Sequence, residues 1–128
     1  MFSKLTVFQT AHAMALHAGS RQALIAQNVA NADTPGYRAR DLPEFSEVMD
    51  ARRNSTGAFR GATTAQGISP TDIARLQPIF EASESPNRNG VSLEDEMVRA
   101  AVVKKDHGRA LGIYRSAMTV LRMSLGSR

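Results

Sequence analysis

Histidine is the side chain best suited to acid–base chemistry near neutral pH, and this sequence of 128 residues contains three of them. His12 and His17 are five residues apart, which places them about 140° apart around a helix. They therefore cannot bind one metal ion in the way that a pair spaced by four residues does. His107 falls within a repeating apolar pattern, which indicates a partly buried packing role. The histidines predict neither a metal centre nor an active site.

Other signatures of catalysis are missing from the sequence as well. No Gly-Lys-Ser or Gly-Lys-Thr is present to form a phosphate-binding loop, and the absence of cysteine excludes thiolate zinc sites, disulfides and thiol catalysis. The acidic residues 94–96 are consecutive, so on a helix they fan outward over about 200° instead of converging on a metal ion. We predict a protein that is not an enzyme, with no catalytic residue, no metal and no cofactor.

The charge of the chain is basic but evenly distributed. Sixteen basic and twelve acidic residues give a net charge of +4 and a pI near 10.1. The basic pairs at 52–53 and 104–105 lack the aromatic neighbours that stack on bases, so we expect no nucleic-acid binding. Arg115 and Arg122 share a heptad position close to Arg109, which indicates either a solvated stripe or pairing with acidic side chains of a neighbouring subunit.

The sequence predicts neither a membrane span nor a cleaved leader. No run of 18 predominantly apolar residues occurs anywhere. The stretch that follows Lys4 is interrupted by Thr6, Gln9, Thr10 and His12, which is a poor match to the apolar core of a signal peptide. We expect no direct membrane insertion, and an N-terminus that is retained.

Proline divides the chain into three parts. All five prolines lie between Pro35 and Pro86, so the two flanks can form long helices whereas the middle cannot. Helices over residues 2–31 and 93–126 would be about 45 and 50 Å long. We predict an all-α fold in which two long terminal helices pair as an elongated coiled-coil hairpin, with an irregular middle segment that contains proline and glycine.

The predicted organisation is one structural unit with three segments. Residues 1–33 form an N-terminal core helix, residues 34–90 form the irregular middle segment with a turn motif at its start, and residues 91–128 form a C-terminal core helix. Within the middle, Phe45, Val48 and Met49 are spaced for one helical turn, and residues 68–80 suit short extended or helical pieces. Residues 51–69 show no assignable pattern.

Both flanks carry mainly apolar residues at alternating spacings of three and four, which keeps one seam of a helix facing a partner. The N-terminal seam contains Phe8, Ala11, Ala15, Ala18, Ile25 and Val29. The C-terminal seam contains Leu93, Met97, Ala100, Leu111, Tyr114, Met118, Leu121 and Leu125. Alanine side chains release little hydrophobic free energy when they pack, so we expect both seams to be assembly surfaces completed by other subunits.

The predicted C-terminal helix has a clear beginning. Ser92 is a suitable N-cap residue, and Asp95 occupies the third helical position of a capping box. The acidic residues 94–96 lie where the helix dipole favours negative charge, so they are best explained as a charged helix start.

A turn motif at residues 28–37, with the sequence Asn-Val-Ala-Asn-Ala-Asp-Thr-Pro-Gly-Tyr, ends the first helix and reverses the chain. Asn31 tolerates the left-handed conformation of a helix end, the following proline keeps Thr34 extended, and Pro35-Gly36 suits the centre of a type II turn. Tyr37 is then directed back toward the helix. The residues of this motif expected to act are Asn28, Asn31, Thr34, Pro35, Gly36 and Tyr37.

These ten residues resemble the signature near the N-terminus of the bacterial flagellar axial family, which comprises rod, hook and hook-associated proteins. The continuation at residues 38–41, the short chain and the lack of a large inserted domain are most similar to proximal rod proteins of the B type, with the C type as the open alternative. Residues 90–97 are similar to the entry of the family's terminal helix. The two matches frame almost the whole chain.

The resemblance implies a structural subunit of the proximal rod of the flagellar basal body, which assembles helically through its terminal helices and transmits torque. It implies export by the flagellar type III apparatus and a periplasmic location. The implied partners are copies of the chain, other rod proteins, and the membrane-ring base with its hook–basal-body adaptor. An alternative is a stand-alone helical adaptor or secretion cofactor that binds a partner through the same apolar seams.

Overall fold

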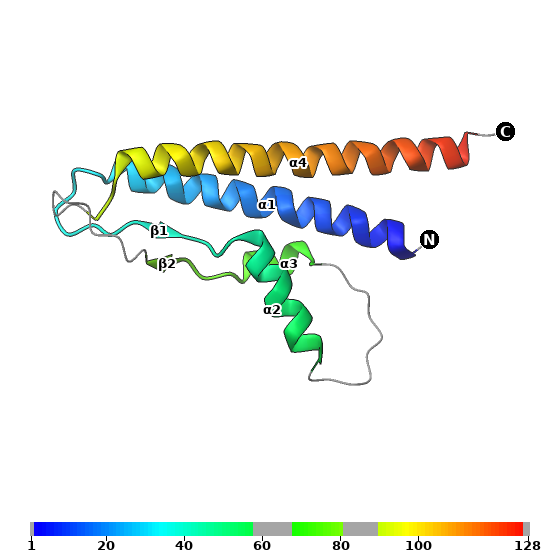
Figure 1. Ribbon diagram of the computed structural model, residues 1–128, viewed down its shortest axis with the longest axis horizontal. Coiled ribbons are helices and arrows are strands. Elements are labelled where there is room, and N and C mark those ends of the chain that lie inside the picture. The colour runs from blue at the N-terminus through cyan, green and yellow to red at the C-terminus, as the bar shows by residue number, and fades with distance from the viewer. Residues whose placement is uncertain (1, 58–67, 81–89, 127–128) are drawn as a thin grey trace.

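A computed structural model of the protein describes residues 2–57, 68–80 and 90–126. Two long helices dominate it: α1 covers Phe2–Ala30 and α4 covers Leu93–Leu125. They lie side by side with both termini at the same end of the molecule (Figure 1). The expected pairing of two long terminal helices is therefore confirmed, whereas coiled-coil geometry stays a prediction.

The interface between the two helices is built mainly from small side chains. Ala18 and Ile25 of α1 form a buried cluster with Val103 of α4, and the half-buried Ala100 packs against it. Toward the termini, the rings of Phe8 and Tyr114 meet edge-on with centroids 5.2 Å apart. Small residues allow two helix backbones to approach closely, because the distance between helix axes depends on the side chains at the contact.

The face of α4 that meets α1 differs in part from the predicted C-terminal seam. The buried residues of α4 are Glu96, Val103 and Ala110, which are seven residues apart and lie one position before Met97, Lys104 and Leu111. Leu93, Met97, Leu111 and Leu125 are 39–78% exposed. The alanine-rich face of α1 packs against the smaller residues of α4, and the larger residues of α4 stay exposed to solvent. Contact of these exposed residues with other subunits stays a prediction.

The middle of the chain is more regular than the predicted irregular segment. It contains the strand β1 (Arg40–Asp41), the helix α2 (Phe45–Gly57), the helix α3 (Pro70–Ala74) and the strand β2 (Ile79–Phe80). The two strands pair antiparallel, with Arg40 opposite Phe80 and Asp41 opposite Ile79. They lie beside α1, on the side away from α4 (Figure 1).

Tertiary packing explains why α2 has thirteen residues instead of the single turn expected from the sequence. Phe45, Val48 and Met49 pack together against a second buried cluster, which is formed by Ala13, Ile68 and Ile73. Only the fold brings Ile68 and Ile73 to this face, so the local sequence gives no sign of the added stabilisation. Residues 58–67, which include most of the unassigned stretch, lie outside the described residues.

Helix α3 begins with a complete capping box that the local sequence did not lead us to expect. The Ser69 hydroxyl accepts from the backbone N–H of Asp72, and the Asp72 carboxylate accepts from the backbone N–H of Ser69. That backbone hydrogen bond is the main reason that the pKa of Asp72 is lowered. Pro70 occupies the first turn, where its missing N–H costs nothing.

Candidate functional site

The predicted turn motif forms a type II turn at the end of α1. The backbone N–H of Tyr37 donates to the carbonyl of Thr34 at 3.2 Å, and Gly36 has a φ of 76°. Glycine is favoured at this position because it has no Cβ to oppose a positive φ. Asn31 also acts through its side chain, since its Nδ2 donates at 2.8 Å to the carbonyl of Gln27, which accepts the backbone N–H of Asn31 at 3.0 Å as well.

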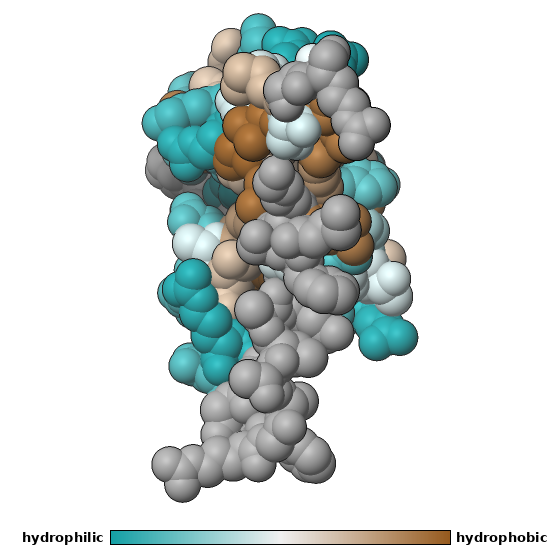
Figure 2. All heavy atoms as spheres, turned by 90° about the vertical axis from the view of Figure 1, so that its right-hand side faces the viewer, coloured by the Kyte–Doolittle hydropathy of each residue, from teal (hydrophilic) through white to brown (hydrophobic). Residues whose placement is uncertain are grey.

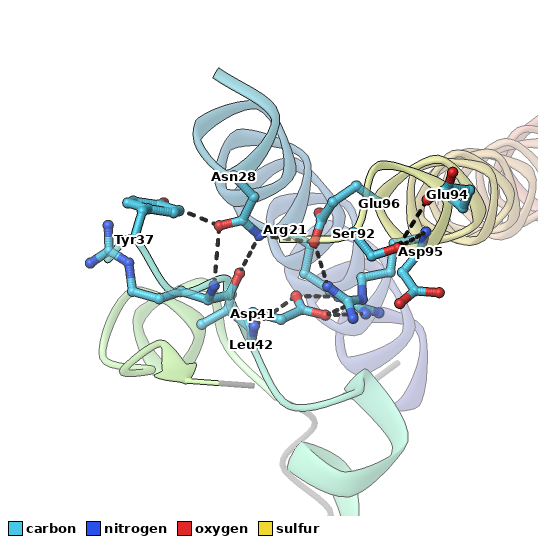
Figure 3. A network of polar contacts seen from close by, with 11 residues as sticks. Arg21, Asn28, Tyr37, Asp41, Leu42, Ser92, Glu94, Asp95 and Glu96 are labelled. Atoms are coloured by element: carbon cyan, nitrogen blue, oxygen red, sulfur yellow. Dashed lines mark hydrogen bonds and ion pairs between the residues drawn. The ribbon is translucent and has the colours of Figure 1, made fainter. Parts of the chain in front are cut away.

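Asn28 is fully buried and ties the returning chain to α1 (Figure 3). Its Oδ1 accepts from the backbone N–H of Arg40 at 3.1 Å and from the Tyr37 hydroxyl at 3.2 Å. Its Nδ2 donates to the carbonyl of Arg40 at 2.9 Å and to Oε1 of Glu96 at 3.2 Å. The Asn28 amide thus pairs with both backbone polar groups of Arg40, as a residue of a neighbouring strand would. The expectation that Tyr37 points back to the helix is confirmed.

Arg21 and Asp41 form a buried, bidentate ion pair between α1 and β1. The Nε and Nη2 atoms of Arg21 donate to the two carboxylate oxygens of Asp41 at 2.9 and 2.7 Å. Oδ1 of Asp41 also accepts from the backbone N–H of Leu42 at 2.7 Å. The hydrogen bonds from Arg21 to Asp41 raise the pKa of the guanidinium, so it stays charged.

Glu96 brings α4 into the same group of polar contacts. Its side chain is 1% exposed, and its Oε1 accepts from Nη1 of Arg99 at 2.7 Å. Nε of Arg99 in turn lies 3.7 Å from Oδ2 of Asp41. Two arginines therefore face two carboxylates in one continuous network of α1, β1 and α4 (Figure 3). Residues 94–96 form the charged start of α4 as expected, and Glu96 is in addition buried.

The chain that enters α4 passes very close to the turn. The backbone N–H of Ala39 donates to the carbonyl of Gly90 at 2.9 Å, and Arg38 and Gly90 form a parallel bridge. A Cβ on Gly90 would lie 2.2 Å from the carbonyl oxygen of Tyr37. Only glycine allows this approach. We call the arrangement of Arg21, Asn28, Asp41, Gly90, Glu96 and Arg99 the polar junction.

The polar junction has no catalytic arrangement, because its charges neutralise one another and its donors and acceptors hold three segments of the chain together. Among the described residues, no three His, Asp or Glu side chains come together to bind a metal ion. None of the described helices has an apolar stretch that could cross a membrane. The arrangement fixes the angle at which the chain leaves the paired helices.

Comparison with known proteins places the motif in a family. Residues 13–38 match the model for flagella basal body rod proteins. The flagellar basal body rod protein FlgB of Agrobacterium fabrum is 26% identical over 125 residues, which cover 94% of this chain and 93% of that protein. FlgB of Escherichia coli K12 is 36% identical over 63% of this chain and 64% of the relative. FlgB of Yersinia ruckeri is 33% identical over 62% of each.

The comparisons support a flagellar basal-body rod protein of the FlgB type, and the chain is a structural rod subunit. The proteins to which it is similar form a family of structural proteins and not of enzymes. The matched residues cover the second half of α1 and the turn, so they contain Arg21, Asn28 and Tyr37 of the network. The match to the last two relatives spans less than two thirds of their own length.

The sequence located the turn of this rod protein but, among the residues of the polar junction, only Asn28. Gly36 and Tyr37 hold the predicted positions in the turn, whereas Arg21, Asp41, Gly90, Glu96 and Arg99 were not expected to take part in the junction. A signal was available for Asp41, Gly90 and Glu96, because they lie in the stretches at residues 38–41 and 90–97 that resemble the family. Arg21 and Arg99 lie outside these two stretches, and a charged residue is most often exposed.

His17 is the buried histidine of the rod protein, and His107, which was expected to be partly buried, is exposed. His17 has an exposure of 2%, its Nε2 lies 2.8 Å from the carbonyl oxygen of Pro43, and its ring packs beside that of Phe45. Burial lowers the pKa of His17 below its ordinary value of 6.5, with Arg21 acting in the same direction and the Pro43 carbonyl, Asp41 and Asp106 opposing it.

We expect acidification from pH 7.5 to 5 to destabilise the rod protein through His17. Between pH 6.5 and the lowered pKa, His17 is protonated in the unfolded chain but stays neutral in the folded chain. The free energy of unfolding therefore falls as the pH is lowered through that interval. Each unit by which the pKa is lowered corresponds to about 1.4 kcal/mol. Thermal unfolding followed by circular dichroism at both pH values would measure this loss.

The control is the second histidine of α1. His12 is exposed, so the variant His12→Gln should keep the full pH dependence, whereas His17→Gln should lose most of it. Equal pH dependence in His17→Gln and the parent protein would contradict the assignment.

Proposed function

We propose that this chain is a subunit of the proximal rod that assembles helically through α1 and α4 and transmits torque along the basal body. The observation that carries the proposal is the lack of burial at the end of α4. Beyond Ala110 no described residue of α4 is buried. Ile113, Val120, Met123 and Leu125 are 40–78% exposed although their side chains are apolar. Figure 2 looks onto the end where the termini lie, and shows apolar side chains at the surface there.

An exposed apolar surface of this kind supports contact with neighbouring subunits, because isolated soluble proteins rarely keep one. Residues 111–125 form about four turns of helix that have no complete packing partner within the chain. Neighbouring subunits would cover them, and the folded ends would gain most of their stability on assembly. The polar junction, at the opposite end of the paired helices, would set the angle between the tubular core and the outer segment.

The proposed setting follows from the family. The partners would be copies of the chain, other rod proteins, and the membrane-ring base with its hook–basal-body adaptor. The chain would be exported by the flagellar type III apparatus without a cleaved signal peptide and would assemble in the periplasm. Deletion of the gene should yield basal bodies that lack the rod from its base, as seen by electron microscopy. Complete rods in the deletion strain would refute the proposal.

We expect the variant Met123→Asp to abolish motility without changing the fold of the isolated chain. Met123 is 64% exposed, so aspartate is solvated in the monomer, but its carboxylate would lose water inside an assembled rod. Each 1.4 kcal/mol of that cost lowers incorporation tenfold, so we expect a drop of at least about a hundredfold. Immunoblots of purified basal bodies would measure it.

The matched control is Asn54→Asp, which adds the same charge to an exposed position on α2. This variant should swim and should be incorporated normally. Normal incorporation of Met123→Asp, or a closed complex of fixed small size formed by the parent protein in light scattering, would contradict helical assembly through the terminal helices.

A further inference from the structure

A groove of about 590 Å³ lies between the first turns of α4, the strand pair and the start of α2. Its apolar lining consists of Leu42, Pro43, Ile79, Phe80, Val98 and Val102. Three of these side chains, at positions 79, 80 and 98, are 54–66% exposed. Its charged lining includes Arg21, Asp41 and Arg99, which pair with one another in the polar junction. Glu44 and Glu47 also line the groove, and both are exposed, which gives it an acidic rim. We call this feature the acidic-rimmed groove.

A matching surface lies on the second half of α4. Its residues recur at alternating spacings of four and three, and so form one stripe along the helix. We call it the C-terminal stripe, and it consists of Leu111, Arg115, Met118, Arg122 and Leu125. Leu111 and Leu125 are 39% and 78% exposed, and both arginines are exposed. The stripe is thus an apolar ridge with two positive charges.

The two surfaces carry opposite charges. Within the described residues, neither the two glutamates of the rim nor the two arginines of the stripe form an ion pair. Seven residues separate the arginines, which is about 10 Å along the helix axis.

The stripe cannot reach the groove of its own chain. Val98 and Val102 lie roughly 160° around α4 from the stripe, and Arg115 lies about 20 Å further along the axis than Val102. A contact between the two surfaces must therefore join different molecules. Because the surfaces differ, each molecule would still have one of each surface available, and the assembly would extend instead of closing as a dimer.

We propose that the C-terminal stripe of one copy docks in the acidic-rimmed groove of the next copy, with Arg115 and Arg122 paired to the glutamates of the rim. This inference rests on the proposed function and names the surfaces that two copies would use. The apolar ridge would cover Phe80 and Val98, and the removal of water would strengthen the ion pairs. The contact uses the middle segment as well as the terminal helices.

Charge reversal of each surface provides the test. The variants Glu44→Lys/Glu47→Lys and Arg115→Glu/Arg122→Glu would each be produced in cells that lack the native gene. Each should lower the amount of chain in purified basal bodies by about tenfold or more, because like charges would then face each other. When both variants are produced together, every contact is again between opposite charges, so the amount in basal bodies and the swimming should recover.

The control is Arg53→Glu/Arg75→Glu, which changes the net charge by the same amount at exposed positions outside both surfaces. It should be incorporated like the parent protein. All altered side chains are exposed, and circular dichroism of the purified variants would show that the helices are intact. Reversed variants that assemble normally, or that fail to recover when produced together, would overturn the proposed docking.

Cross-linking identifies the partner directly, because the chain has no native cysteine. Oxidised basal bodies that contain the Glu47→Cys/Arg115→Cys variant should give a ladder of multimers of this chain alone. A cross-link to a different rod protein, or none while the chain is present in the basal bodies, would overturn the docking of a second copy. Absence of the parent chain from basal bodies would instead refute the proposed function.

Discussion

The variant Asp41→Ala is expected to lower the thermal unfolding midpoint of the protein by about 15 °C, the largest effect of any single substitution considered for this chain. Asp41 is 7% exposed and accepts hydrogen bonds from both Arg21 nitrogen donors and from the backbone of Leu42. Its removal leaves the buried guanidinium of Arg21 without its carboxylate, and breaking a buried ion pair in this way costs about 3–5 kcal/mol.

Thermal unfolding at equal protein concentrations, followed by circular dichroism at 222 nm, would measure the loss. Asp50→Ala is the matched control, because the Asp50 side chain is 68% exposed and its ion pair with Arg53 is long, at 3.4 Å. Its midpoint should stay within about 2 °C of the parent value, since surface ion pairs contribute at most about 1 kcal/mol.

A double variant separates the cost of a broken pair from the contribution of the pair itself. Arg21→Met/Asp41→Leu removes both charges and fills the space with apolar atoms, so it should be clearly more stable than Asp41→Ala. If Asp41→Ala unfolds at the same temperature as Asp50→Ala, the ion pair does not hold β1 against α1, and the polar junction does not stabilise the returning chain.

The second large effect is expected from the addition of one methyl group, in Gly90→Ala. The new Cβ would lie 2.2 Å from the carbonyl oxygen of Tyr37 and 2.9 Å from Cα of Arg38, and both atoms belong to the backbone. The two chain segments must therefore separate, which breaks the hydrogen bond from Ala39 to Gly90. We expect a cost of about 3 kcal/mol and a midpoint lower by about 10 °C.

Other glycines of the chain provide the controls for this substitution. A Cβ on Gly108 meets nothing within 4 Å, so Gly108→Ala in the middle of α4 should raise stability by about 1 kcal/mol. Gly36 also has open space around it but has a positive φ, so Gly36→Ala should cost about 1–2 kcal/mol from backbone strain alone. A ranking in which Gly90→Ala is milder than Gly36→Ala would contradict the close approach at the turn.

The role of the chain as a rod subunit gives these stability effects a functional consequence. The polar junction connects α1, β1 and α4 at one end of the molecule, and the exposed apolar residues of the second half of α4 lie toward the other end (Figure 1). A subunit with a rigid junction and an incomplete helical end is suited to assembly, because the junction fixes geometry before the neighbours complete the packing.

The positions of the two long helices followed from the sequence alone, since proline is confined to the middle and proline is incompatible with a helix interior. The type II turn was also determined locally, because Pro35 and Gly36 each favour the backbone angles of one turn position. The helix bounds of Phe2–Ala30 and Leu93–Leu125 agree with the expected 2–31 and 93–126 to within one residue.

The tertiary structure decided which faces of those helices meet and which charges are buried. A repeat of three and four residues predicts that one stripe of a helix is buried, but two stripes of α4 that are shifted by one position both fit such a repeat. Close packing against the alanines of α1 decided between them, and it buried Val103 and Ala110 instead of Leu111. The partners of Arg21 and Glu96 lie 20 and 68 residues away in the chain, at Asp41 and Asn28. Such pairs depend on how the chain returns through the turn, and local propensity carries no information about contacts at that separation.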